Sequence, residues 1–300
     1  EYKWDGIRAQ LIKTHETIRL WSRGDQDITE QFPDIIEAAT TLPSQLILDG
    51  EILAGSPEQL QTFNDLQTRL NRKRITQNLL KTNPAFFKAY DLLRFDGEDM
   101  RTQPLTVRKN ILSKINVIQS QVIYPAAHQD IQDMRLKARI EGAEGIMIKD
   151  RQSTYVGGRK TGHWWKWKLD PMTADCVLIY AQAGHGRRAS LHSDYTLACW
   201  NQNNELVPVA KAYSGLTDAE LKAMDQWIRK HTLQKFGPVR QVEAVQVFEI
   251  GFEGIARSTR HKSGIALRFP RILRWRQDVG PQDADHLSHF ETLMSDSNAV

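Results

Sequence analysis

Cysteine is scarce in this sequence of 300 residues, and long apolar runs are absent from it. The two cysteines, Cys176 and Cys199, belong to no CxxC pair, and neither has a histidine at metal-ligand spacing. We therefore expect no zinc site and no disulfide framework, and a reducing cytoplasm suits the chain. No apolar run reaches the length of about 18 residues that a membrane span needs, and no signal peptide opens the sequence. We expect a globular protein without a membrane segment.

An excess of charge is also missing, since the formal net charge is only +4 with an isoelectric point of about 9.0. The basic residues nevertheless cluster in the second half, in GHGRR (184–188), RSTRHK (257–262) and RFPRILRWR (268–276). Any single cluster is as readily a solvated face. Three of them in one half favour a surface that follows phosphate groups.

The first part of the chain alternates strand-like and helix-like segments without internal repeats. Runs of β-branched and aromatic residues predict strands at 7–12, 17–22, 45–54, 85–93, 144–150 and 163–170. Helical spacing of apolar residues predicts helices from Leu60 to Leu70, at 104–115 and at 130–140. This is an α+β pattern with mostly antiparallel connections.

Composition changes near Pro171, which divides the chain into expected domains at 1–170 and 171–300. The second domain shows five short strand candidates, at 177–184, 195–200, 206–213, 244–252 and 266–270. A helix at 218–231 lies between the third and the fourth. A five-stranded barrel with an interposed helix is the OB-type arrangement, which often binds nucleic acids. The polar tail after Pro281 is expected to fray.

Charged residues interrupt several predicted strands, namely Lys3, Asp5, Glu51, Glu144, Lys149, Lys166 and Lys168. One such charge more often marks the solvent face of a strand. In KWD (3–5) and KWK (166–168), however, the alternation places both charges on one face. A cleft lined by lysines and carboxylates suits a nucleoside triphosphate with its divalent cation.

A lysine in such surroundings has a chemical use. An amine among other cations and away from bulk water is partly neutral and therefore nucleophilic. Its attack on the α-phosphate of a nucleotide would form a phosphoramidate. An aspartate can orient this amine, and a glycine lets the backbone approach the ligand. The opening EYKWDGIR (1–8) contains each of these residue types.

Seven motifs in order make the sequence similar to ATP-dependent DNA ligases, within the covalent nucleotidyltransferase superfamily. EYKWDGIR resembles the KxDGxR nucleophile motif, and WSRGDQDIT (21–29) resembles the SRxG element. The later motifs are LDGEI (48–52), KAYDLL (88–93), EGIMIK (144–149), WWKWK (164–168) and LRFPRILRWRQD (267–278). The resemblance implies an antiparallel-sheet adenylation domain, the nucleotidyltransferase domain, followed by a five-stranded OB-fold barrel.

The resemblance implies roles for the residues around the nucleotide. Lys3 would be the nucleophile that becomes adenylated. Glu1 would contact the adenine edge, and Tyr90 would stack on the adenine face. Arg8 and Glu51 would bind the ribose.

Further roles concern the phosphates and the metal ion. Arg23 would reach the 5′-phosphate of the nick or the phosphate of AMP. Glu144 would hold the divalent metal, Mg²⁺ or Mn²⁺. Lys166 and Lys168 would bind the α-phosphate, while the resemblance leaves the role of Lys149 open.

The closing motif would supply Arg271 and Arg276, which orient the pyrophosphate when the OB domain folds over the site. The family often has a lysine after the aspartate of this motif, whereas here Val279 follows Asp278. This departure removes one cation from the orientation of the pyrophosphate, and the sequence leaves its effect on self-adenylation open. The sequence also starts two residues before Lys3, so we expect a catalytic fragment without the N-terminal DNA-binding domain of its relatives.

The implied activity is the sealing of nicks in duplex DNA through lysyl-AMP and DNA-adenylate, with ATP as co-substrate. Arg187, Arg188, Arg260 and Lys262 are the expected DNA-binding cations. A monomer that acts in bacterial repair, recombination or replication, in the cytoplasm at the nucleoid, is expected.

Two other classes remain. An RNA ligase or a capping-type nucleotidyltransferase would use the same lysine chemistry, although the SRxG and RFPR elements favour DNA ligases. A non-catalytic OB-type nucleic-acid binder is disfavoured because every expected nucleotide contact is present. An NAD-dependent ligase is also disfavoured, because it would contain a four-cysteine zinc module and this sequence has only two cysteines.

Overall fold

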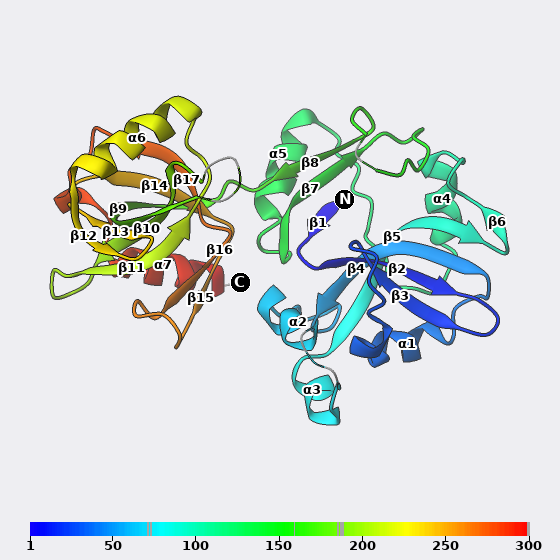
Figure 1. The fold of residues 1–300 in the computed structure, drawn as a ribbon. Helices are drawn as coiled ribbons and strands as arrows, with labels where there is room; N and C mark the ends of the chain where they lie inside the picture. Colours follow the sequence, from blue (N-terminus) through cyan, green and yellow to red (C-terminus); the bar gives the residue numbers. More distant parts are fainter. Residues whose placement is uncertain (71, 73, 159, 185, 187–188, 299–300) are drawn as a thin grey trace. The chain divides into compact units, whose positions relative to one another are not determined.

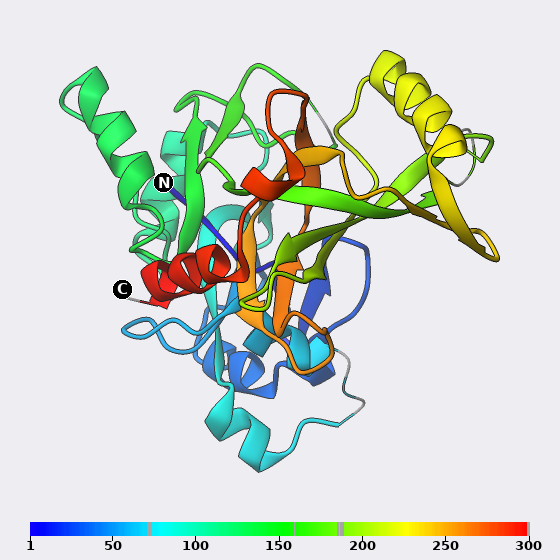
Figure 2. The same cartoon turned by 90° about the vertical axis from the view of Figure 1, so that its left-hand side faces the viewer.

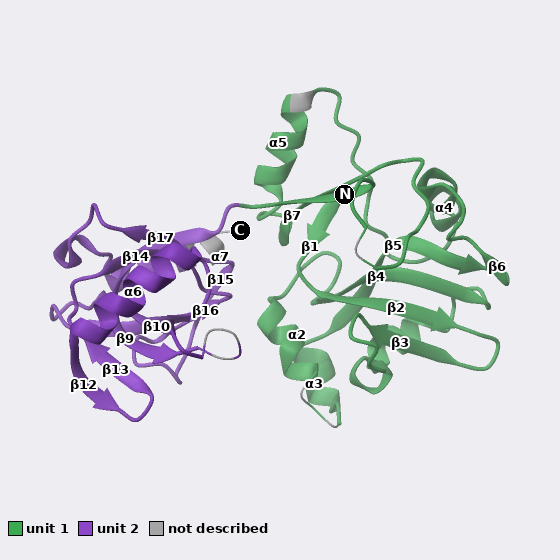
Figure 3. Cartoon of the chain, turned by 45° about the horizontal axis from the view of Figure 1, so that its top comes forward, with its two compact units in different colours: residues 1–169 green, residues 170–300 purple. Residues whose placement is uncertain are grey.

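The computed structural model describes residues 1–298 except 71, 73, 159, 185, 187 and 188. The chain folds into two compact units, Glu1–Leu169 and Asp170–Val300 (Figure 3). Both units combine antiparallel sheets with helices, so the predicted α+β class is confirmed.

The larger sheet of the first unit has five antiparallel strands in the order β3-β2-β4-β5-β6 (Figure 1). They are β2 (Ile7–Lys13), β3 (Ile18–Ser22), β4 (Leu46–Ala54), β5 (Ala85–Phe95) and β6 (Glu98–Asp99). Glu51 on β4 is directly opposite Arg8 on β2. Directly opposed residues project from the same face of a sheet. The register thus places these two candidate side chains together.

A smaller sheet of three antiparallel strands carries the remaining motifs of this unit. Its order is β1 (Tyr2–Trp4), β7 (Ala143–Lys149) and β8 (Trp164–Lys168). Because β7 is central, Glu144 has a neighbouring strand on each side. Lys3 lies on one of these strands, and Lys168 lies on the other.

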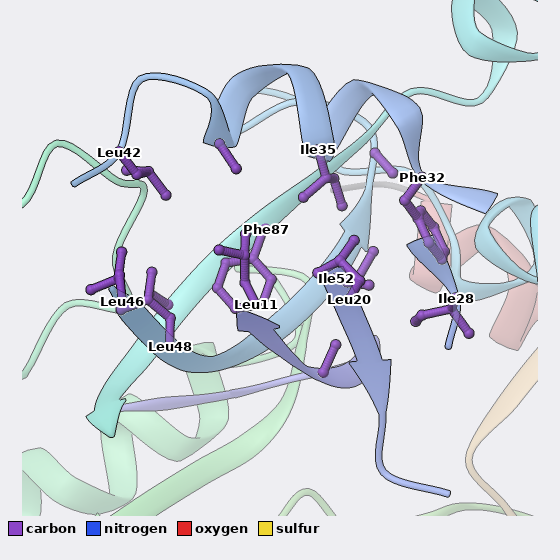
Figure 4. Close-up of a cluster of buried hydrophobic side chains, with 14 of the residues drawn as sticks. Leu11, Leu20, Ile28, Phe32, Ile35, Leu42, Leu46, Leu48, Ile52 and Phe87 are labelled. Carbon is purple, nitrogen blue, oxygen red and sulfur yellow. The ribbon is translucent and has the colours of Figure 1, made fainter. Parts of the chain in front are cut away.

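Helices and a buried apolar cluster pack against the sheets of this unit. The helices are η1 (Thr29–Gln31), α1 (Pro33–Ala39), α2 (Phe63–Leu70), α3 (Gln77–Thr82), α4 (Leu105–Leu112) and α5 (His128–Lys137). Helices α1, α2 and α4 contact the larger sheet, whereas α5 contacts β7 of the smaller one. Phe32 and Ile35, at the start of α1, face Leu11, Leu20 and Ile52 of the sheet (Figure 4). The helix expected from Leu60 begins at Phe63 instead, because Leu60 forms a bridge with Gly55.

The second unit is built on a long central strand, β9 (Met172–Ala183). Its main sheet has the order β11-β10-β9-β13-β12, and β14 pairs with both β9 and β17. The other strands are β10 (His192–Trp200), β11 (Leu206–Ala212), β12 (Thr232–Phe236), β13 (Val239–Val242), β14 (Val247–Phe252), β15 (Gly254–Arg257), β16 (Ile265–Arg268) and β17 (Arg271–Arg276). Helix α6 (Asp218–Lys230), yellow in Figure 2, contacts β10, and its buried residues include Leu221, Met224 and Ile228.

Two expectations for the second unit are corrected. The sequence predicted five strands, whereas the described residues form more, since β12 and β13 make an additional hairpin and 271–276 is the separate strand β17. The hairpin strands were missed because TLQKF and VRQV are short and polar. The tail after Pro281 was expected to fray, yet it forms η3 (Pro281–Asp283) and helix α7 (Leu287–Asn298).

Helix α7 is ordered by packing rather than by composition. Phe290 is fully buried and its ring stacks on Phe252, with the ring centroids 5.8 Å apart. Met294 lies one turn further and is buried in the same core. Two apolar residues spaced by four align on one face of a helix.

No helix within the described residues combines the length and apolar character that a membrane crossing requires.

Candidate active site

The carboxylate of Glu144 brings two of the predicted lysines together. Lys3, on β1, contacts one carboxylate oxygen, and the Lys168 Nζ lies 2.8 Å from the other oxygen. Burial by itself would raise the pKa of Glu144. Hydrogen bonds and charges from Lys168 and Lys3 outweigh this effect, so the pKa lies below its ordinary value. The side chains are partly exposed, which leaves the cluster accessible to a ligand.

Two glycines allow the backbones around this cluster to approach closely. A Cβ atom at Gly145 would lie 2.4 Å from the carbonyl oxygen of Trp167 on β8. A Cβ atom at Gly6 would lie 2.2 Å from the carbonyl oxygen of Ile52 on β4. The sequence interpretation assigned Gly6 to the approach of a ligand. The structure shows that Gly6 lets the start of β2 meet β4, next to Glu51, and the approach of a ligand at Gly6 stays a prediction.

Arg8 is held by a buried carboxylate that the sequence analysis did not assign. Its Nε and Nη2 donate to the two oxygens of Asp49 at 3.1 and 2.6 Å. The hydroxyl of Tyr155 accepts from Arg8 at 2.9 Å and donates to Asp49 at 2.9 Å. Tyr90 donates to the same carboxylate at 3.3 Å. The structure therefore places Arg8 and Tyr90 around Asp49, and it adds Tyr155 to the predicted set.

Glu51 lies close to both groups of residues. Burial raises its pKa to about 8, and the nearby charge of Lys3 opposes this rise. The carboxylates of Asp49 and Asp5 raise the pKa further, while Arg8 lowers it. Burial is therefore the main reason why the pKa of Glu51 lies above that of an ordinary carboxyl group.

Glu1 is bound between two lysines at the other end of β7. Its carboxylate is 4% exposed, and its oxygens lie 2.5 Å from the Lys109 Nζ and 3.0 Å from the Lys149 Nζ. Lys149 also faces the rings of Tyr90 and Trp164, with its Nζ 5.0 and 4.5 Å from the ring centroids. Lys149 therefore contacts both Glu1 and Tyr90, so these two candidate residues lie near each other.

The remaining candidates of this unit lie at its surface. Lys166 is exposed on β8, two residues before Lys168 and on the same face of the strand. Arg23 is exposed, and its backbone N–H donates to the carbonyl of Arg8 at 3.2 Å. The SRxG element therefore lies next to the nucleophile motif in the fold.

A divalent metal fits this arrangement only together with a substrate. No group of three or more His, Cys, Asp or Glu side chains that could hold a metal occurs in the described part of the chain. Mg²⁺ is commonly bound by one or two carboxylates, with phosphate oxygens and waters as its other ligands. Glu144 could serve as such a single carboxylate once its oxygens exchange their contacts with Lys3 and Lys168.

In the second unit, the arginines of the closing motif are paired with carboxylates of their own unit. Arg271 lies 3.2 Å from Glu253. Arg276 lies 2.7 Å from Asp175 and 3.0 Å from Asp278. Val279, the departure from the family motif, packs beside a small apolar cluster. Orientation of a pyrophosphate by these arginines would require them to leave their carboxylates.

Three cations of the β15–β16 hairpin differ from Arg271 and Arg276 in that they form no ion pair with a described carboxylate. Arg257, Arg260 and Lys262 are exposed, and no carboxylate among the described residues lies within ion-pair distance of them. Arg187 and Arg188 lie outside the described residues. Of the predicted DNA-binding set, the structure thus describes Arg260 and Lys262, both on this hairpin.

Phe269 is a strained residue that the sequence analysis missed. It is 64% exposed and has a φ of 51°, in the left-handed region that bulky side chains rarely adopt. The Arg268 guanidinium lies 5.1 Å from its ring centroid. Backbone strain of this kind concentrates at functional sites. The RFPR letters could have drawn attention to Phe269, but its exposure is a property of the fold.

Comparisons with known proteins agree with these features. Residues 1–168 match the model of the ATP dependent DNA ligase domain, and residues 188–279 match that of the ATP dependent DNA ligase C terminal region. A probable DNA ligase of Koribacter versatilis is 37% identical over 98% of this chain and 56% of the relative. A DNA ligase of Natronomonas pharaonis is 34% identical over 98% of this chain and 54% of the relative. The chain spans about half the length of these curated relatives.

Solved structures share the fold. One described as Pmar-Lig_PreS3 has a TM-score of 0.69 at 19% identity, covering 92% of this chain and 62% of that one. Another, from a structure–function analysis of Lig E DNA ligases, has a TM-score of 0.63 at 17% identity, covering 92% and 91%. The predicted adenylation and OB-fold architecture is confirmed. From its sequence and its fold, the chain belongs to the ATP-dependent DNA ligase family.

Proposed function

We propose that this chain seals nicks between a 5′-phosphate and a 3′-hydroxyl in duplex DNA, with ATP as co-substrate. The observation that carries the proposal is the pairing of Lys3 and Lys168 with the two oxygens of Glu144. The pairing supports the proposal because it brings together the residues to which we assign the nucleophilic amine, a phosphate-binding cation and the metal-binding carboxylate.

In the first step, the Lys3 Nζ gives a proton to solvent and attacks the α-phosphorus of ATP. A P–N bond forms, the bond from the α-phosphorus to the bridging oxygen breaks, and pyrophosphate leaves. Lys168 and Lys166 bind the α-phosphate oxygens, and Arg271 and Arg276 orient the pyrophosphate. A divalent cation at Glu144 would neutralise part of the phosphate charge.

The nucleotide is held by the residues around Asp49 and Lys149. Tyr90 stacks on adenine, Glu1 accepts from its exocyclic amine, and Arg8 and Glu51 bind the ribose. The burial of Glu1 and the fixed position of Arg8 support these assignments.

In the next steps, AMP passes from Lys3 to the 5′-phosphate of the nick, and the 3′-hydroxyl then displaces AMP. Arg23 contacts a phosphate during this transfer. The unpaired cations Arg260 and Lys262 support DNA binding by the β15–β16 hairpin, and Arg187 and Arg188 belong to the same proposal. We also propose that the protein acts as a monomer on nucleoid DNA, which size-exclusion chromatography and localisation of a tagged protein would test.

The direct test is incubation with α-labelled ATP and Mg²⁺, followed by a denaturing gel. Acid-labile label on the chain is expected, and it should move to the 5′-phosphate when a nicked duplex is added. Absence of label would contradict the proposal. Transfer to a nicked RNA or to a 5′-diphosphate RNA end in preference to DNA would instead support an RNA ligase or a capping-type enzyme.

A further inference from the structure

Lys109 is a buried cation next to the nucleotide site that no sequence motif singled out. It lies on α4, its side chain is 15% exposed, and its Nζ is 2.5 Å from an oxygen of Glu1. Burial lowers the pKa of Lys109, and the negative charge of Glu1 opposes this effect. The other oxygen of Glu1 is 3.0 Å from Lys149. Each carboxylate oxygen therefore has its own lysine.

The helix that carries Lys109 is anchored to the strand that carries Tyr90. Arg108, the preceding residue, is fully buried and donates to both oxygens of Asp91 at 2.7 and 2.9 Å. Arg108 also donates to the carbonyl of Ser153 at 3.1 Å. Asp91 follows Tyr90 on β5. Lys109 therefore has a defined position relative to the ring proposed to stack on the base.

The two lysines determine how the Glu1 carboxylate is oriented and charged. An ionised carboxylate only accepts hydrogen bonds, whereas a protonated one also donates. Burial by itself would raise the pKa of Glu1, but Lys149 and Lys109 outweigh it and the pKa lies below its ordinary value. If one partner of a buried ion pair is removed, the charge of the other is left poorly compensated. The carboxylate would then turn toward Lys149 or take up a proton.

Adenine and guanine present opposite groups to such a carboxylate. Adenine offers the amine at its position 6, which donates, whereas guanine offers a carbonyl at the same place, which accepts. A fixed, ionised carboxylate favours adenine, because guanine would leave it facing another acceptor. A mobile or protonated carboxylate discriminates less between the two bases.

We propose that Lys109 is a positioning residue that holds the Glu1 carboxylate ionised and in place, and thereby sets the preference for adenine over guanine nucleotides. This inference rests on the proposed function, because it concerns the base that enters the adenylation reaction. Lys109 acts through Glu1, the residue that its Nζ contacts.

The experiment compares self-adenylation with α-labelled ATP and α-labelled GTP in Lys109→Met, Lys109→Gln and Lys109→Arg. The measured quantity is the ratio of kcat/KM for ATP to that for GTP. We expect the two neutral variants to lower this ratio roughly tenfold or more, since each removes one partner of a buried ion pair. Lys109→Arg retains the cation and should stay near the wild-type ratio. Lys114→Met, which removes an exposed lysine just after α4, is the matched control.

A double-mutant cycle shows whether Lys109 acts through Glu1. In a Glu1→Gln background, Lys109→Met should change the ATP-to-GTP ratio little further, because the group that it positions is already altered. Equal effects in both backgrounds would overturn the proposal.

The other outcomes separate this inference from the proposed function. An unchanged ratio in folded Lys109→Met would overturn the inference alone. Failure of both neutral variants to fold, seen as loss of cooperative thermal unfolding, would also overturn it by making Lys109 a structural residue. If the wild-type chain takes no label from ATP, the proposed function itself fails.

Discussion

The Lys168 Nζ lies 2.8 Å from Glu144, the residue that the family resemblance assigns to the metal. The other oxygen of this carboxylate contacts Lys3. Two ammonium groups therefore contact the oxygens with which Glu144 would hold a divalent cation. A cation held there would take the place of these contacts, and Lys3 would then be released to face the α-phosphate.

Glu144→Ala should slow self-adenylation far more than it lowers stability. Loss of a metal-binding carboxylate removes charge neutralisation in the transition state, which costs roughly several kcal/mol of barrier. The adenylation rate measured against Mg²⁺ concentration tests this, with Glu141→Ala, an exposed carboxylate nearby in sequence, as control. An unchanged Mg²⁺ curve would mean that Glu144 only pairs with the lysines.

Lys3→Ala should abolish formation of enzyme–AMP, because the reaction requires an amine at this position. The same variant should still close a nick that already carries AMP, since that step needs metal and phosphate contacts but no lysine nucleophile. Gel assays with α-labelled ATP and with pre-adenylated nicked DNA check both statements. Label on the alanine variant would show that another lysine is the nucleophile.

Glu51 should make stability depend on pH. Its pKa is about 8 in the folded protein and near 4.5 in the unfolded chain. The folded state therefore binds this proton more tightly, so the contribution is fully present below about pH 4.5 and is lost as pH rises through about 8. Glu51→Gln removes the titrating group, so its unfolding midpoint should fall less than that of the wild type between these pH values. Metal-free thermal unfolding checks this, and the exposed Glu58→Gln should behave like wild type.

Two groups of cations should serve different steps. The cations of the β15–β16 hairpin should serve DNA binding, whereas the arginines of the closing motif should serve self-adenylation. Arg260→Ala with Lys262→Ala should weaken nick binding and flatten its salt dependence by about one unit of slope per lost phosphate contact. Self-adenylation should change little in this variant. Arg271→Ala should slow adenylation and leave the salt slope nearly intact. Filter binding across a salt series and an adenylation assay test both, and proportional loss of both activities would contradict the division.

Phe290→Ala should destabilise the second unit by about 3–5 kcal/mol, because it removes a fully buried ring from the core. Chemical denaturation measures the change in the free energy of unfolding. Glu291→Ala, on the exposed side of α7, should have a small effect. A near-zero change for Phe290→Ala would mean that the tail frays in solution, as its composition suggested.

Local patterns in the sequence were sufficient for the α+β class and for the placement of the main strands. Period-two alternation placed Lys166 and Lys168 on one face of a strand, and β8 has that form. The weak elements escaped because β12 and β13 are short and polar. In α7, the two buried residues that order the helix carry too little signal to stand out in a polar tail.

The sequence by itself determined the family and the chemical types available, because seven short motifs keep their order and their residue types along the chain. The tertiary structure alone decided which of these residues meet. Asp49 and Tyr155 hold Arg8 across separations of 41 and 147 residues, and Lys109 reaches Glu1 from a helix that matches no motif. Cys176 and Cys199 looked isolated in the sequence, yet their sulfur atoms lie 3.1 Å apart in the core. Contacts of this kind depend on how strands pair and helices pack, and no local periodicity records them.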